Sequence, residues 1–345
     1  MKELIKTLSD LRGISGYEYR ISDKIAEFFS PYADEVRKDA LGNIIAVKRC
    51  GKDNAPKIMI EAHTDEIGLM VSGIDKNGFI LFVPVGGVDK RILPASEVIV
   101  HGIKDLKGVI GAKPPHLQNP GEQNKSSEMS DMAIDVGMNE EQVRAVVSIG
   151  DSITFAQSVG EMGGQFSGKT LDDRAGVAAI VTVMKNLTKL RLDADVYAVA
   201  AVQEEVGLRG AKTAAYGVCP DIAVSIDVCH GITPDNSKNA FEVGDGVVIS
   251  IGPNIHPKLF ERLKKTAAEH HLKVQYDVDG GDTGTDAWAI QVSRMGVPTA
   301  LLSIPLKYMH TSVETLCVSD VEITAELLTF FIHNIGEDTE GWLCL

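Results

Sequence analysis

The sequence has few features of secreted, membrane-spanning or nucleic-acid-binding proteins. Its five cysteines are scattered and no two form a C-x-x-C pair, so neither a disulfide framework nor a cysteine zinc site is indicated. No apolar run approaches the roughly 20 residues that a membrane span requires. The 34 basic and 48 acidic side chains give a net charge of −14, which argues against nucleic acid and anionic membranes as main partners.

The start of the chain does not have the pattern of a signal peptide. MKELIKTLSDLRGISG carries charges throughout and has the periodicity of an amphipathic helix. We therefore expect a cytoplasmic protein. With 345 residues, the chain is long enough for one large or two ordinary domains with ample core.

Four short apolar runs stand out, and each ends in polar residues. They cover residues 57–66, 196–205, 221–230 and 299–310. They are rich in Val, Ile, Ala and Leu without alternation, which is typical of strands buried on both faces. Helical patterns lie at 19–29, 174–187, 257–271 and 319–335. This alternation predicts an α/β fold with a mostly parallel central sheet flanked by helices.

The segment 68–162 has a different texture, with many glycines and little helical signal. Its short alternating pieces lie at 79–85, 96–103 and 107–112, and a polar stretch at 118–131 indicates a loop. We predict that 68–162 is a small β-rich domain inserted into a catalytic domain made of 1–67 and 163–345.

Side chains that can bind metals follow the apolar runs. In an open α/β sheet, ligands bind beyond the carboxyl ends of the strands. The side chains at these ends are His63, Asp65, Glu204, Glu205, Asp227, His230 and His310, and Asp172 and Asp173 precede a predicted helix. Imidazoles and carboxylates without cysteine suit zinc, cobalt or manganese. Each residue alone has an ordinary structural interpretation, but carboxylates gathered in one cleft repel unless cations neutralise them.

A competing motif lies beside this set. The stretch from Gly163 to Thr170 matches G-x-x-x-x-G-K-[ST], the phosphate-binding loop of nucleotide triphosphatases. That loop needs a strand leading into its first glycine and a helix beginning at its Lys-Thr. Here QSVGEM precedes Gly163, and the helical pattern begins only at Arg174. A nucleotide-binding function is therefore the less favoured hypothesis.

Motifs along the whole chain resemble the TET-type dinuclear metalloaminopeptidases. This family includes glutamyl and deblocking aminopeptidases and some proteins labelled endoglucanase. The motifs are H-T-D-E-I-G at 63–68, G-A-K-P-P-H-L at 111–117, L-D-D-R at 171–174, Q-E-E-V-G-L-R-G-A at 203–211, S-I-D-V at 225–228 and Y-M-H-T at 308–311. The resemblance implies a zinc-exopeptidase type of fold and the removal of N-terminal residues from short peptides.

The resemblance also implies a site with two divalent metal ions, zinc or cobalt, with manganese as a further candidate. Its residue assignments are His63 and Asp227 for one ion, Glu205 and His310 for the other, and Asp172 as the bridge, followed by a cis peptide bond to Asp173. Glu204 is expected as the general base and Asp65 as the partner of the His63 imidazole.

Further expectations concern substrate and assembly. Asp286, in the glycine-rich stretch 280–287, is expected near the substrate, and His116 is expected to be structural or interface-forming. Relatives form dimers through the inserted domain and often dodecamers, so we expect self-association. A metal-dependent hydrolase of N-acylated amino acids or glycans is the alternative function.

Overall fold

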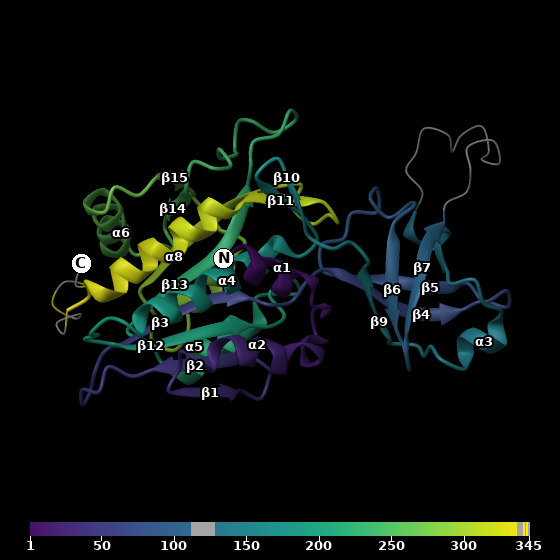
Figure 1. Cartoon of the computed structure of the whole chain (residues 1–345), viewed down its shortest axis with the longest axis horizontal. Coiled ribbons are helices and arrows are strands. Elements are labelled where there is room, and N and C mark those ends of the chain that lie inside the picture. The colour runs from purple at the N-terminus through teal and green to yellow at the C-terminus, as the bar shows by residue number, and fades with distance from the viewer. Residues whose placement is uncertain (112–127, 337–340, 342, 344–345) are drawn as a thin grey trace.

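The computed structural model describes residues 1–111, 128–336, 341 and 343. The molecule has a large lobe, in which helices pack on a sheet, and a smaller lobe made of strands β4 to β9 (Figure 1). Residues 112–117 of the G-A-K-P-P-H-L motif, His116 among them, lie outside the described residues.

Four adjacent parallel strands form the centre of the main sheet. In spatial order they are β12 (Asp195–Ala201), β3 (Lys57–His63), β13 (Ile222–His230) and β16 (Thr299–Lys307). Each predicted apolar run contains one of them. Neighbouring side chains on a strand point to opposite faces, and Ile58 and Ile60 join one core cluster while Met59 joins another. Both faces are buried, which explains why the runs do not alternate.

Antiparallel strands extend this centre on both sides, so the eleven-stranded sheet of the described chain is mixed. One margin consists of β2 (Ile44–Lys48) and β1 (Glu35–Lys38). The other consists of β17 (Glu314–Cys317), β11 (Gln165–Gly168) and β10 (Gly160–Met162). In addition, β14 (Val247–Ile251) pairs with β16 and with β15 (Val274–Val278). The expected α/β fold is confirmed, with parallel pairing mainly at the sheet's centre.

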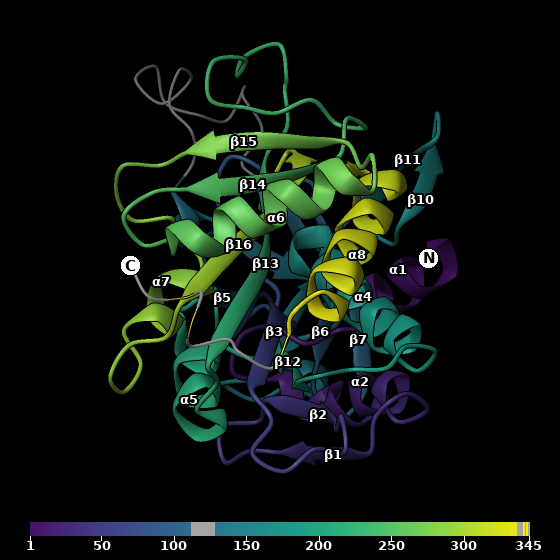
Figure 2. The same ribbon diagram turned by 90° about the vertical axis from the view of Figure 1, so that its left-hand side faces the viewer.

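Helices cover both faces of the sheet (Figure 2). The larger core contains side chains of α1 (Lys2–Asp10), α2 (Ser22–Phe29), α4 (Leu171–Leu187), α6 (Pro257–Glu269) and α8 (Val318–His333). The second core contains side chains of α5 (Arg209–Val218) and α7 (Asp286–Gln291). In the described parts of the chain, no helix has the length and apolarity to cross a membrane. The cytoplasmic location stays a prediction of the sequence.

The smaller lobe is a closed β-barrel with its own hydrophobic core. Its strands, in order around the barrel, are β4 (Gly68–Ile74), β5 (Ile80–Val85), β8 (Ala133–Asp135), β7 (Asp105–Gly111), β6 (Glu97–His101) and β9 (Ser152–Phe155). The predicted insertion, 68–162, contains all of them, but β10 pairs within the main sheet. We retain the two-domain division as a proposal, with the barrel ending near Phe155.

Candidate active site

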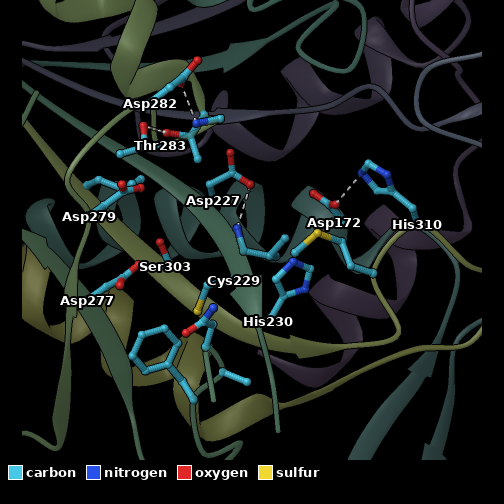
Figure 3. A pocket seen from close by; sticks show the side chains of 18 of the residues that line it. Asp172, Asp227, Cys229, His230, Asp277, Asp279, Asp282, Thr283, Ser303 and His310 are labelled. Carbon is cyan, nitrogen blue, oxygen red and sulfur yellow. Dashed lines mark hydrogen bonds and ion pairs between the residues drawn. The ribbon is translucent and has the colours of Figure 1, made fainter. Parts of the chain in front are cut away.

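The sequence-predicted metal ligands converge at the carboxyl ends of the central parallel strands. His63 is the last residue of β3, Asp227 lies near the end of β13, and His310 follows β16. Asp172 lies at the start of α4, which packs on β3 and β13. Figure 3 shows Asp172, Asp227 and His310 around one pocket. Parallel strands end at the same edge of a sheet, so residues far apart in the chain meet there.

The carboxylate of Asp172 stands between the two imidazoles. Its Oδ1 is 3.2 Å from Nε2 of His63, and its Oδ2 is 3.4 Å from Nε2 of His310. The same His310 nitrogen lies 3.2 Å from Oε1 of Glu205. The peptide bond between Asp172 and Asp173 is cis, as the resemblance implies. Asp172 therefore offers one oxygen to each half of the site.

Three overlapping groups of side chains have the donor spacing of a metal site. In each group the ligand atoms lie within 4.8 Å of one another. The groups are His63 with Asp172 and Asp227, Asp172 with Glu205 and His310, and His63 with Glu204 and Glu205. The first two share Asp172 and together contain all five expected ligands. This donor set, two imidazoles and three carboxylates, fits two divalent ions of the zinc or cobalt type.

The electrostatics of the cluster also fit cations. Burial and nearby carboxylates raise the pKa of Glu204 to about 10, and burial beside Asp172 raises the pKa of Asp227 to about 7. Burial lowers the pKa of His310, but hydrogen bonds to Asp172 and Glu205 outweigh it and raise that pKa to about 11. These directions show a buried surplus of negative charge that divalent cations would neutralise.

Asp65 connects the His63 strand to the two glutamates. The backbone oxygen of Asp65 is the hydrogen-bond partner of His63 Nδ1 at 3.2 Å, and its carboxylate Oδ1 lies 3.6 Å from the same nitrogen. The backbone N–H groups of Glu204 and Glu205 donate to the two carboxylate oxygens at 3.1 and 3.2 Å. The hydroxyl of Ser15 donates to Asp65 Oδ2 at 2.6 Å. Asp65 thus fixes both the imidazole and the Glu204–Glu205 backbone, whereas the resemblance implied only the first contact.

Glu314 is a supporting residue that the sequence motifs did not identify. Its Oε2 accepts hydrogen bonds from the backbone N–H of Leu171 at 2.8 Å and of Asp172 at 3.1 Å. Its Oε1 accepts from the N–H of His310 at 3.1 Å. Glu314 is 3% exposed and holds two ligand-bearing segments together. A carboxylate four residues after His310 is its only signal in the sequence.

The ligand segments contain backbone in the left-handed region at residues other than glycine. Thr170, Gln203 and His310 have φ of 62°, 58° and 59°. Such conformations are disfavoured for side chains with a Cβ and concentrate at functional sites. Each of these residues is in, or within two positions of, the ligand set.

Asp286 is buried behind the cavity and does not line it. It is 2% exposed, and neither carboxylate oxygen has a hydrogen-bond partner in the described chain. Burial and the neighbouring Glu61 raise its pKa well above the usual range. The expected contact with substrate stays an untested prediction, and this position favours a supporting role for Asp286 instead.

The phosphate-loop hypothesis does not agree with the structure. Lys169 and Thr170 are 3% and 4% exposed, and both hydrogen-bond to Oε2 of Glu66 at 2.8 Å. The Lys169 amine also donates to the backbone oxygens of Ser9 and Leu11 at 3.1 and 3.0 Å. These side chains are saturated by internal partners, so they cannot hold a phosphate as a Walker loop does.

A cavity of about 950 Å³ opens beside the ligand cluster. His63, Asp172, Glu204, Glu205, Asp227 and His310 line one part of it. The opposite part is lined by segments that the sequence analysis did not associate with the site, among them Asp277, Asp279 and Asp282. A cavity of this size suits a small-molecule or short-peptide substrate.

Comparison with known proteins identifies the family. A model of the M42 glutamyl aminopeptidase family matches residues 42–327. The chain belongs to the M42 glutamyl aminopeptidase family. The predicted family and enzyme class are thereby confirmed, and this M42 protein is an aminopeptidase, a hydrolase of peptide bonds.

Named relatives support the same conclusion over at least 96% of this M42 aminopeptidase. It is 38% identical to the lysyl aminopeptidase of Pyrococcus furiosus, covering 96% of this chain and 97% of the relative. The TET aminopeptidase of a marine sediment Thaumarchaeota archaeon is 32% identical with a TM-score of 0.93, over 99% and 98% of the two chains. The TET1 peptidase of Pyrococcus horikoshii, which can assemble into a tetrahedron or a large octahedral shell, is 33% identical with a TM-score of 0.85, over 97% and 99%.

Proposed function

We propose that this M42 aminopeptidase removes N-terminal residues from short peptides with a site that holds two divalent metal ions. The observation that carries the proposal is the Asp172 carboxylate, which faces His63 with one oxygen and His310 with the other. We assign His63 and Asp227 to one ion, Glu205 and His310 to the second, and Asp172 to both. Zinc or cobalt is the proposed metal.

When bound, a pair of such ions supplies Lewis acidity, lowering the pKa of a water and polarising the scissile carbonyl. Glu204 is the carboxylate of the cluster that we leave outside the five ligands, and it lines the cavity. We assign it the role of general base, which takes a proton from the attacking water and passes it to the leaving amine. Asp65 holds the backbone of Glu204 and Glu205, so that the two carboxylates keep their separate roles.

The charge of the site favours an exopeptidase. At neutral pH most free α-amino groups are protonated and positively charged, and the surrounding carboxylates attract them. An internal peptide bond lacks this cation. The acidic cluster therefore selects for the N-terminal residue of a substrate.

For assembly, we propose self-association through the barrel, with the dodecamer as the full form. The shells named for the P. horikoshii TET1 peptidase support this proposal. On β5, Leu81 and Val83 are 41% and 39% exposed, and the adjacent Phe79 is 39% exposed. Alternate residues of a strand share one face, so the three side chains form an apolar strip on the outside of the barrel.

A panel of aminoacyl p-nitroanilides, assayed with zinc or cobalt and again after chelation, tests the function. We expect turnover of substrates with a free amino group, its loss with chelator, and its return with added metal. Turnover confined to N-acylated amino acids or to glycans would instead support the alternative hydrolase. Metal analysis of the purified protein tests the expected two ions per chain.

A further inference from the structure

We infer that the cavity beside the catalytic cluster is a specificity pocket for a positively charged N-terminal side chain, lysine or arginine, with Asp277 as its main determinant. This inference rests on the proposed aminopeptidase function and adds the substrate class. It is carried by the residues of the cavity wall formed by β13, β16, β15 and the loop before α7.

The charges that line the cavity are unbalanced. Among the described residues, seven carboxylates line it, against a single lysine, the exposed Lys238. The seven are Asp172, Glu204, Glu205, Asp227, Asp277, Asp279 and Asp282. The proposed ions and general base account for the first four. The other three form no ion pair with a lysine or arginine of the described chain, so their negative charge is left for a ligand.

Ser303 gives a second, independent indication of a polar ligand. It is 4% exposed and lines the cavity, yet its hydroxyl has no hydrogen-bond partner among the described residues. The hydroxyl of this buried residue is therefore available to a ligand or a water in the cavity. Ser303 is the register partner of Asp227, and Figure 3 shows it between Asp227 and Asp277. The wall between the cluster and Asp277 is therefore polar.

The spacing favours a long side chain. From β13, which carries Asp227, the sheet continues through β16 and β14 to β15, which carries Asp277. Three strand separations amount to about 14 Å at about 4.8 Å each. Lysine has a flexible four-carbon stem with a terminal ammonium, which covers about half of this backbone-to-backbone span, and the side chains of Asp227 and Asp277 with the bound amino group cover the rest. A leucine side chain is too short to carry a group to Asp277, and a glutamate side chain would meet like charge.

The three free carboxylates differ in how they are held. Asp279 accepts the backbone N–H of Gly281 at 2.9 Å, and Asp282 accepts that of Gly284 at 2.8 Å. For Asp277 the donor is the backbone N–H of the adjacent Val278, and no side chain of the described residues donates to its carboxylate. Partial burial, with the neighbouring Asp279, raises the pKa of Asp277. A bound ammonium would relieve the repulsion between Asp277 and Asp279. We therefore expect Asp277 to contribute more to the binding of a cationic side chain than Asp279 or Asp282 does.

The test uses the full-length, metal-loaded protein and the p-nitroanilides of lysine, arginine, leucine and glutamate. We expect kcat/KM for the lysyl and arginyl substrates to exceed that for leucyl by about tenfold or more, and glutamyl to be the poorest. Asp277→Asn should reduce the lysyl-to-leucyl ratio by about tenfold. Asp53→Asn, an exposed aspartate outside the cavity, makes the same change in net charge and should leave the ratio unchanged.

A binding measurement separates this inference from the proposed chemistry. Calorimetry with the Glu204→Gln variant compares lysyl-alanine with norleucyl-alanine, whose side chain lacks the charge. We expect tighter binding of the lysyl peptide by about tenfold, abolished when Asp277→Asn is added. If Asp277→Asn lowers the melting temperature, the same kinetic and calorimetric comparisons are made with Asp279→Asn and Asp282→Asn instead.

The two failures are distinguishable. Equal binding of the two dipeptides, with a lysyl-to-leucyl ratio that none of the three aspartate variants moves, overturns the charged pocket and leaves the aminopeptidase function intact. Absence of turnover with every free-amine substrate overturns the proposed function, and the calorimetric comparison still decides whether the cavity prefers a cation.

Discussion

At the scale of single residues, Glu204 and Asp172 test the division between base and ligand. We expect Glu204→Gln to retain metal near two ions per chain while kcat falls at least about 100-fold, because glutamine cannot accept the water's proton. Asp172→Ala should instead lose metal, because Asp172 faces both His63 and His310. Metal analysis beside steady-state kinetics separates the two outcomes. Near-native turnover by Glu204→Gln would show that the assigned roles are wrong.

Glu314 tests the support behind the ligands. Its carboxylate accepts three backbone N–H groups, from Leu171, Asp172 and His310. A glutamine there presents an amide N–H to one of these donors, so the two segments should separate. We expect Glu314→Gln to lower metal affinity about 10- to 100-fold, as for other residues that orient ligands. Metal titration checks this, with the exposed Glu322→Gln on α8 as the charge-matched control. Equal affinity in both variants would contradict the supporting role.

At the scale of elements, the strands that could be predicted from the sequence are those in which burial restricts the side chains to apolar residues. The strands β3, β12, β13 and β16 were predictable because both faces are buried, which leaves continuous apolar runs ending in ligands. Strand β15 was not predicted, because VQYDV carries polar residues that line a cavity rather than a core. Asp277 was missed for the same reason, and Glu314 because its partners are backbone groups, which a sequence does not specify.

The barrel offers a pH test far from the ligands. His101, on β6, is 3% exposed, with Nδ1 2.8 Å from Asp105 and Nε2 2.9 Å from Thr154. Burial lowers the pKa of His101 although Asp105 opposes it. Below about pH 6.5 the unfolded chain therefore binds a proton that the folded barrel does not, and stability falls as the pH falls. Between about pH 7.5 and 5.5, His101→Gln should lose less unfolding free energy than the wild type.

One control variant makes this result specific. The control is His333→Gln on α8, which removes an exposed histidine. Chemical denaturation at both pH values supplies the free energies. Identical slopes for the wild type and His101→Gln would mean that His101 has the same proton affinity folded and unfolded.

At the scale of the whole molecule, the segment after β5 brings the barrel lobe to the active site. Gly86 and Gly87 follow β5, and Gly87 lines the cavity. A Cβ at Gly87 would lie 2.8 Å from Nδ1 and 3.1 Å from Cε1 of His310, the ring whose Nε2 faces Asp172. A Cβ at Gly86 would lie 3.3 Å from that of Glu205. The smaller lobe therefore limits where two of the proposed ligands can stand.

Gly87→Ala tests this coupling between lobes. The added methyl must displace or rotate the His310 ring, and small displacements of catalytic groups cost large factors in rate. We expect kcat/KM to fall about tenfold or more, with weaker binding of the metal that His310 holds and little change in melting temperature. The control is Gly160→Ala on β10, where a Cβ would meet nothing within 4 Å. Native kinetics in both variants would mean that the segment carrying Gly87 moves and His310 keeps its position. The catalytic lobe would then position its ligands independently of the barrel.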